Sequence, residues 1–407
     1  MRILYLCQRY GDEIVGGSES ACRAFAEQLS ARGHHVQVLT STAREYTTWA
    51  NHYPPGSSIL NGVQVHRLTV GAERVAETFG PMQEWVVHGP KPMPLFQQQR
   101  WLEMVGPSVE GLEEWLHAHA DDFDVAIFMT YLYCTTTRGL PALAGRLPVV
   151  LQPTAHDEPS IWATAFDTIL RLPDAYLYFT PSERAFMEQR LHRRTEGAVA
   201  GIGIDQHPVA DPSLFRTAYG LGDKPYLLYV GRIDGGKGTD EAARFFTAYQ
   251  RRNPSDLQLV MAGELIGASQ QHSGVVYTGF LDEAMKRSAM AGSLALLQPS
   301  YFESFSIVLC ESWVQGRPAL VQDGCAVLGS QVRRSSGGLP YTGFATFEAA
   351  LDLLRHDVAL ASRLGAMGQQ FVRDSYSWPV VLDGVESVIE LAIQRFKARR
   401  RGGGEPD

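Results

Sequence analysis

Two glutamates separated by seven residues lie in the segment FESFSIVLCESW, residues 302–313. Ser304 is a favoured residue type for a helix N-cap, and the run that follows keeps a helical period as far as Gly316. We therefore expect Glu303 in the loop before the helix and Glu311 about two turns along it, at ~1.5 Å per residue. A carboxylate accepts hydrogen bonds from two hydroxyl groups, so the pair suits a polyhydroxylated ligand. Spacing alone would favour a simpler interpretation, two surface glutamates on an amphipathic helix.

The start of the same helix is an expected anion site. The first N–H groups of an α-helix have no acceptor within the helix, and the helix dipole favours negative charge there. The N–H groups of Phe305, Ser306 and Ile307 should therefore point toward a ligand, and we place Ser304 with them. If the diphosphate group of a ligand bound at this helix end, one end of that ligand would reach the first glutamate and the other end would reach the second.

A glycine-rich loop, GRIDGGKG at residues 231–238, follows the apolar run YLLYV. Its glycines allow a close approach of backbone to ligand, and Arg232 and Lys237 supply two cations that can neutralise a diphosphate. The loop is not a P-loop, because GxxxxGK[ST] is absent. By itself it could carry ordinary surface charges. Together with the glutamate segment, at another strand end of the same domain, it predicts a site for a diphosphate-containing ligand.

Short apolar runs alternate with amphipathic runs twice along the chain, first from RILYLC and again from KPYLLYV. Such alternation predicts a parallel sheet covered by helices, so we expect an α/β protein with two Rossmann-like, doubly wound domains facing across a cleft. Residues 79–101 fit neither pattern and are expected to form a long loop or lid. The expected divisions are a first domain at 1–200, a linker at 201–215, a second domain at 216–375, a C-terminal helix at 376–397 packing back toward the first domain, and a disordered tail at 398–407.

Composition narrows the class of protein. The chain has 407 residues, of which 45% are hydrophobic and 20% charged, and this is typical of a globular protein with more than one domain. A net charge of −8 does not favour binding to nucleic acid. Basic runs at residues 192–194 and 397–401 are interpreted as solvated surface, with contact to anionic lipid as the alternative. Five scattered cysteines, no signal-peptide pattern and no apolar run of ~20 residues lead us to expect a cytoplasmic protein, or one at the inner face of a membrane.

These motifs resemble those of the retaining nucleotide-sugar glycosyltransferases of the GT-B fold, in glycosyltransferase family 4. The family's two glutamates with seven residues between them are similar to Glu303 and Glu311, and its Gly-Arg…Lys-Gly motif is similar to residues 231–238. The resemblance covers nearly the whole chain. Further similar segments are VGGSE at residues 15–19, GIGID at 201–205 and YSW at 376–378.

The resemblance implies catalytic roles for four residues. Arg232 and Lys237 would hold the donor diphosphate, and Glu303 would hydrogen-bond the transferred sugar. His156, in LQPTAHDEP, would face that sugar, although a purely structural histidine is an equally weighted alternative. Glu311 would bind the ribose hydroxyls. Donor-binding roles are implied for Gly16, Gly17, Phe280, Ser304, Phe305, Ser306, Ile307 and Glu311.

The sequence departs from the family pattern at two positions. The family usually has glycine where this chain has Ser306, and alanine is common where it has Ser312. Because glycine eases the approach of backbone to a ligand, Ser306 bears directly on the expected diphosphate contact.

The resemblance implies transfer of a sugar from a UDP- or GDP-linked donor to an acceptor hydroxyl, with retained anomeric configuration. We expect no cofactor and no metal, because Arg232 and Lys237 would stand in for one and no DxD-type or His/Asp cluster is evident. The acceptor could be a glycan, a lipid-linked precursor or a small molecule, and peripheral membrane contact stays open. The alternatives are a sugar-nucleotide 2-epimerase of the same fold and a non-catalytic partner subunit. A dinucleotide oxidoreductase is disfavoured, since no GxGxxG follows RILYLC.

Overall fold

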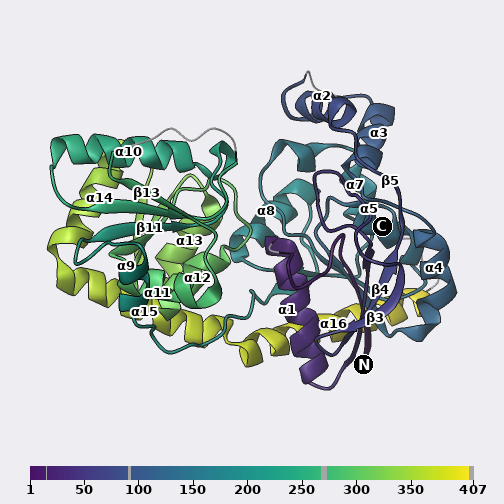
Figure 1. The fold of residues 1–407 in the computed structure, drawn as a ribbon. Helices are drawn as coiled ribbons and strands as arrows, with labels where there is room; N and C mark the ends of the chain where they lie inside the picture. The colour runs from purple at the N-terminus through teal and green to yellow at the C-terminus, as the bar shows by residue number, and fades with distance from the viewer. Residues whose placement is uncertain (15, 90–92, 267–272, 403–407) are drawn as a thin grey trace. The chain divides into compact units, whose positions relative to one another are not determined.

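The computed structural model describes the chain except for residues 15, 90–92, 267–272 and 403–407. It contains two compact units (Figure 1). The first unit comprises Met1–Gly203 and Val381–Asp407, and the second comprises Ile204–Val380. The change of unit after Gly203 falls inside the segment expected as a linker.

The sheet of the first unit has the order β10-β9-β8-β7-β1-β2-β4-β3. All neighbouring strands are parallel except β3 and β4, which form an antiparallel edge. This confirms the parallel sheet that the β–α alternation predicts. The strands are β1 (Arg2–Leu6), β2 (His35–Ser41), β3 (Gly56–Leu60), β4 (Val63–Leu68), β7 (Val125–Met129), β8 (Val149–Gln152), β9 (Ala175–Tyr178) and β10 (Gly197–Val199), with a separate pair β5 (Val70–Ala72) and β6 (Ser108–Val109).

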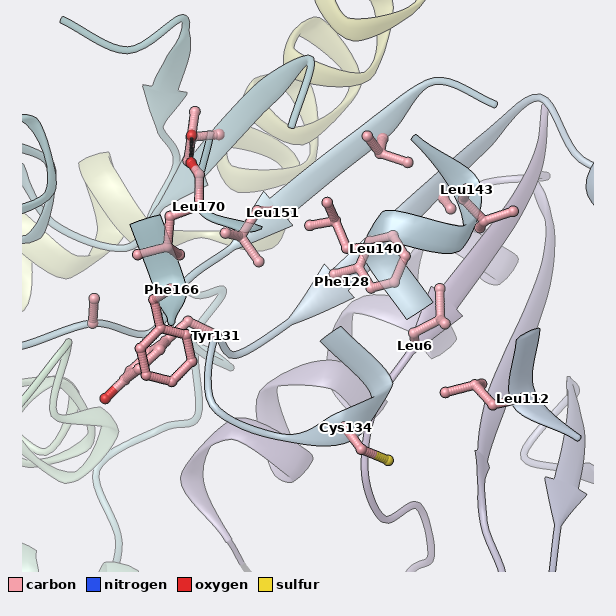
Figure 2. Packing of buried hydrophobic residues seen from close by; sticks show 14 of the residues in the cluster. Leu6, Leu112, Phe128, Tyr131, Cys134, Leu140, Leu143, Leu151, Phe166 and Leu170 are labelled. Carbon is pink, nitrogen blue, oxygen red and sulfur yellow. Dashed lines mark hydrogen bonds between the residues drawn. The ribbon is translucent and has the colours of Figure 1, made fainter. Parts of the chain in front are cut away.

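Both faces of this sheet are covered by helices. Strand β7 is buried at every position, which explains why VAIFM reads as a continuous apolar run. Leu6, Phe128 and Leu151 pack on one face with helix residues such as Leu112 and Leu140 (Figure 2). The helices are α1 (Gly17–Ala31), α2 (Ala76–His88), α3 (Leu95–Val105), α4 (Leu112–His119), α5 (Cys134–Thr137), α6 (Gly139–Leu143), α7 (Phe166–Ile169) and α8 (Pro181–Leu191), with short 3-10 turns η1 (Ala120–Asp122) and η2 (Pro159–Trp162).

The prediction of a loop for residues 79–101 is wrong. Except for residues 90–92, which lie outside the described residues, most of this segment belongs to α2 and α3. The side chains of Val86 and Trp101 are buried in the core, and the Trp101 indole donates to the Gln83 side chain at 2.8 Å. Tertiary packing of these apolar residues therefore overrides the local signal of the prolines.

Helix α16 (Trp378–Gly402) belongs to the first unit from Val381 onward. Val385 and Ile389 are fully buried, and Glu386 lies 2.8 Å from the His34 ring. The Arg395 guanidinium donates to the Asp174 carbonyl oxygen at 3.0 Å. The helix extends to Gly402, so residues 398–402 are not part of a disordered tail, and residues 403–407 lie outside the described residues.

The second unit holds a six-stranded parallel sheet of order β13-β12-β11-β14-β15-β16. Leu227 and Tyr229 of the central strand pack beneath α10 and α14, whereas Tyr226 and Leu228 pack against α9 and α11 on the other side (Figure 1). The strands are β11 (Tyr226–Val230), β12 (Gln258–Ala262), β13 (Val275–Gly279), β14 (Ala295–Gln298), β15 (Ala319–Gln322) and β16 (Gly338–Tyr341). The helices are α9 (Ser213–Ala218), α10 (Thr239–Arg252), α11 (Glu283–Gly292), α12 (Ile307–Val314), α13 (Ala326–Ser335), α14 (Phe344–His356) and α15 (Val358–Tyr376), with a 3-10 turn η3 (Gly235–Lys237).

Each sheet has one point where the strand order reverses. In the first unit β1 lies between β2 and β7, and in the second unit β11 lies between β12 and β14. The chain leaves the two strands at such a point in opposite directions, and ligands bind outside their carboxyl ends. The fold therefore places the loop after β11 beside the loop after β14.

Helix α12 is held in place by α15, and this contact requires a glycine. A Cβ added to Gly365 would lie 2.1 Å from the Gly316 carbonyl oxygen. We predict that Gly365→Ala lowers the free energy of unfolding by about 1–3 kcal/mol, because backbone must move to admit the methyl group. Ser362→Ala, at an exposed position of the same helix, is the matched control and should stay within about 0.5 kcal/mol of the parent protein. Urea unfolding followed by fluorescence measures both, and an equal midpoint for the two variants would contradict the prediction.

Candidate donor site

The glycine-rich loop after β11 is organised by Asp234. This residue is the N-cap of η3, and its carboxylate accepts the backbone N–H of Lys237 at 3.0 Å. The same carboxylate pairs with the Arg232 guanidinium. The Tyr229 hydroxyl donates to the Arg232 carbonyl oxygen at 2.7 Å. Both predicted cations are thus presented at the carboxyl end of the sheet by a loop with a fixed conformation.

Lys237 and Glu303 form an ion pair between the two loops of the switch point. Lys237 Nζ lies 2.8 Å from Glu303 Oε1, and the two side chains are 32% and 15% exposed. Gly238 has φ +71°, and a Cβ there would lie 2.4 Å from the Pro299 carbonyl oxygen. The final glycine of GRIDGGKG therefore allows the loop after β11 to approach the loop after β14, which carries Glu303.

The glutamate-containing helix begins later than expected. Its N-cap is Ser306, and the prediction of Ser304 as N-cap is wrong, since α12 starts at Ile307 and ends at Val314. Ser306 has φ +72°, in the left-handed region, and its hydroxyl accepts from the Gln298 side chain at 2.9 Å. Among the residues that the structure describes, the N–H groups of Ser306 and Ile307 have no protein acceptor. Unpaired donors of this kind are what an anion site at a helix start requires.

Phe305 contributes to this helix start through its backbone. The Phe305 side chain is buried and packs edge-on against Tyr376, with ring centroids 4.9 Å apart. The Gln331 side-chain amide donates to the Phe305 carbonyl oxygen. The aromatic ring therefore anchors the loop to the core.

Glu311 is held by a lysine of the neighbouring helix. Lys286 Nζ lies 2.8 Å from Glu311 Oε1 and 2.9 Å from Glu283 Oε1. Burial acts to lower the pKa of Lys286, but the contacts with both carboxylates outweigh it, so its pKa is raised. Within the described part of the chain, the buried Glu311 Oε2 has no hydrogen-bond partner. The carboxylate is thus fixed through one oxygen and keeps an unused acceptor on the other.

Phe280 lies directly after β13, at the same end of the sheet. Its side chain is 72% exposed, and the preceding Gly279 has φ +73°. A large apolar side chain with so much exposed surface is available to stack against a planar ligand group.

In the first unit, the glycine pair lies at the start of α1. Gly16 is the N-cap, and a Cβ there would lie 2.3 Å from Glu19 Oε2. Glu19 is buried and accepts from Arg9 Nε at 2.9 Å and from the Ser18 hydroxyl at 2.7 Å. A Cβ on Gly17 would meet no atom within 4 Å in the described structure. Glycine is needed at position 16 because a Cβ there would clash with Glu19, which Arg9 holds in place. Steric contacts within this unit do not require glycine at position 17. Val15, the first residue of the VGGSE motif, lies outside the described residues.

His156 follows β8, also at the carboxyl end of its sheet. Its side chain is 27% exposed, and Nδ1 lies 4.0 Å from Glu158 Oε2. Glu158 is itself fixed, because its other carboxylate oxygen accepts from the Tyr131 hydroxyl at 2.6 Å. The ring thus lies beside a carboxylate whose position is set by the core.

The predicted residues form two groups. Gly16, Gly17 and His156 belong to the first unit, and all the other predicted site residues belong to the second unit. Sequence reasoning missed Asp234 and Lys286. An Asp before Gly-Gly is a turn signal that could have indicated the first. No spacing links Lys286 to Glu311, because the two residues meet only through the packing of α11 on α12.

The described residues lack two further features. They contain no group of three or more His, Cys, Asp or Glu side chains arranged to hold a metal ion. They also contain no helix with the length and apolarity required to span a bilayer.

The conformation of Ser306 leads to a stability prediction. Ser306→Gly relieves the left-handed strain, which costs about 1–2 kcal/mol in a residue with a Cβ, but gives up the bond to Gln298. Ser306→Ala gives up the same bond and keeps the strain. Allowing for the greater freedom of glycine in the unfolded chain, we predict that the glycine variant is more stable than the alanine variant by about 1 kcal/mol. Equal urea midpoints for the two variants would contradict this.

Comparison with known proteins agrees with the geometry. Residues 214–370 match the family described as glycosyl transferases group 1. The chain is 26% identical over 387 residues to the alpha-D-kanosaminyltransferase of Streptomyces kanamyceticus, covering 87% of this chain and 94% of that protein. It is 24% identical over 432 residues to the glycogen synthase of Mycobacterium tuberculosis, covering 100% and 97%. The solved structure of HepE from Anabaena in complex with UDP superimposes with a TM-score of 0.67 at 14% identity, covering 96% of this chain and 100% of that one. The chain therefore has the GT-B fold, and the comparisons support a glycosyltransferase, with names of relatives that fit family 4, which its motifs resemble.

Proposed function

We propose that this glycosyltransferase moves a sugar from a UDP- or GDP-linked donor to an acceptor hydroxyl, with retention of anomeric configuration and without a metal ion. The observation that carries the proposal is the Lys237–Glu303 ion pair, 2.8 Å long, at the switch point of the second sheet. It joins a cation suited to the leaving diphosphate to a carboxylate suited to sugar hydroxyls. The N–H groups at the start of α12 lie on the same loop as Glu303.

The chemistry follows from where charge develops. Cleavage of the sugar–phosphate bond leaves negative charge on the diphosphate and positive charge on the sugar ring. Arg232, Lys237 and the N–H groups of the helix start would stabilise the diphosphate, and a single such donor is typically worth about 3–4 kcal/mol. On binding, Lys237 would exchange part of its contact with Glu303 for phosphate oxygens, and Glu303 would then accept from the sugar.

The nucleoside part of the donor has its own expected contacts. The unused Oε2 of Glu311 is an acceptor that a ribose hydroxyl would satisfy. Phe280, whose side chain is exposed, would border the base. The relative of similar fold that was solved with UDP supports a uracil base, and guanine is the alternative to test.

The acceptor is assigned by class only. Relatives named for kanosaminyl transfer and for glycogen synthesis support a role in the biosynthesis of a glycan or glycoconjugate. A lipid-linked precursor, with peripheral contact to the inner face of a membrane, is included in the proposal. A small-molecule acceptor is also included. The proposed location of the protein is the cytoplasm. His156 keeps the role that the family resemblance gives it, contact with the transferred sugar.

The first test is a thermal-shift panel of UDP, GDP, ADP, CDP and NAD, each with and without EDTA. We predict that one nucleoside diphosphate raises the melting temperature and that EDTA does not reduce the shift. At 100 times its Kd the ligand should stabilise the protein by about 2.7 kcal/mol. Glu311→Ala should abolish the shift. No response to any nucleoside diphosphate would contradict the proposed donor, and loss of the shift in EDTA would contradict metal independence.

Two substitutions test the ion pair in transfer. Glu303→Gln and Lys237→Ala should each lower the rate of transfer by at least about 100-fold while leaving the melting temperature close to that of the parent protein. Glu348→Gln is the matched control, since it removes another ion pair of the same unit, with Arg252 at 2.8 Å. Full transfer activity in either site variant would contradict the proposed role of this ion pair. Analysis of the products formed from the donor without acceptor separates a transferase from a 2-epimerase.

A further inference from the structure

The first unit contains a buried carboxylate that the proposed chemistry does not use. Glu183, on α8, is 1% exposed. Its Oε1 accepts the backbone N–H of Ala155 at 2.8 Å, and its Oε2 accepts the backbone N–H of Phe179 at 2.7 Å. Burial raises the pKa of Glu183 to about 8, and the backbone N–H donors act in the opposite direction. A buried carboxyl group is costly unless it is hydrogen-bonded, so its contacts indicate what it contributes.

The position of the Glu183 side chain is set by the start of its helix. Thr180 is the N-cap of α8, and its hydroxyl accepts the Glu183 N–H at 3.1 Å. Pro181 occupies the first position of the helix, where its fixed φ is favourable. TPSE is therefore a helix-start signal visible in the sequence. The N–H of Phe179, just before Thr180, belongs to the same turn.

The second contact of Glu183 reaches a different loop. Ala155 lies in the loop after β8, between Thr154 and His156, and its side chain is fully buried. Thr154 has φ +50°, an uncommon conformation for a residue with a Cβ, and such strain persists only where the surrounding structure holds it. The Glu183–Ala155 bond fixes the backbone between this strained residue and the histidine. Glu158, fixed by Tyr131, lies beside the histidine ring.

We propose that Glu183 is a positioning residue, which holds the backbone at Ala155 so that His156 is presented at the carboxyl end of the first sheet. This inference rests on the proposed function, in which His156 contacts the transferred sugar. Glu183 acts only through the backbone, and removing its contact should therefore alter the step that uses His156 without altering nucleotide binding by the second unit.

The same two strands provide a matched control. Asp174 is buried just before β9, and its Oδ2 accepts the backbone N–H of Val149 at 2.9 Å, at the start of β8. It therefore joins β8 to β9 at the amino ends of the strands, as Glu183 joins the loops at their carboxyl ends. Asp174→Asn should lower stability like a Glu183 variant but leave His156 in place.

The first measurement is hydrogen exchange of peptides covering residues 153–158. In Glu183→Gln, only one side-chain oxygen remains to accept, and the amide NH₂ faces an N–H donor. We expect exchange at these residues to rise at least about tenfold relative to the parent protein, and to stay unchanged in Asp174→Asn. Equal exchange in the parent protein and Glu183→Gln would overturn the proposal. Glu183→Asp, which keeps the carboxyl group on a shorter side chain, replaces the glutamine variant if that variant does not fold.

The second measurement is a double-mutant cycle on turnover of the nucleotide sugar. Glu183→Gln and His156→Ala should each lower kcat at least about tenfold with an unchanged Kd for the nucleoside diphosphate. The double variant should be no slower than His156→Ala within a factor of two, because both changes remove the same contribution. Multiplicative losses, or a kcat loss in Asp174→Asn equal to that in Glu183→Gln, would overturn the proposal.

The two hypotheses fail in different ways. A parent protein that binds and turns over no nucleotide sugar contradicts the proposed function, and the exchange experiment then still decides whether Glu183 holds the loop. A parent protein that turns over donor while the cycle is multiplicative contradicts only the role of Glu183.

Discussion

The central constraint of the second unit is that its sheet is parallel and is covered by helices on both faces. The sheet extends on both sides of β11. The connection that follows β11 and the connection that follows β14 must therefore run to opposite faces of the sheet. At that point the loops cannot be covered by the helices they lead to. This brings Lys237 and Glu303, 66 residues apart in the sequence, to within 2.8 Å of each other. The strand order thus sets the position of the candidate site, and the particular side chains on the two loops set its chemistry.

The charges at the candidate site are balanced by ion pairs within the protein. Lys237 pairs with Glu303, Lys286 with Glu311, and Arg232 with Asp234. Leaving the charges of the two partly buried lysine–glutamate pairs without a partner would cost several kcal/mol. In the proposed function, a dianionic ligand would bind by exchange of partners with side chains that these ion pairs already order. Ordered side chains lose less entropy on binding, which is the physical content of preorganisation.

The sequence predicts the strands and the loops that follow them, because apolar runs, glycines and helix periodicity are local signals. It identifies Glu303, Lys237 and the other motif residues as candidates for the same reason. It misplaces the helix start at Ser304, since the choice of Ser306 depends on a bond from Gln298, eight residues earlier, on β14. It also assigns a loop where α2 and α3 form, because the burial of Trp101 is a tertiary effect. Lys286 has no local signal at all.

The return of α16 to the first unit makes that unit discontinuous in sequence. Its last element is separated from the rest by the whole of the second unit, Ile204–Val380. Val385 and Ile389 are buried, Glu386 contacts the His34 ring, and Arg395 reaches the Asp174 carbonyl. During synthesis the second unit is complete in the chain before this helix emerges from the ribosome. The first unit can therefore complete its core only after a segment that is translated later than the whole of the second unit has become available.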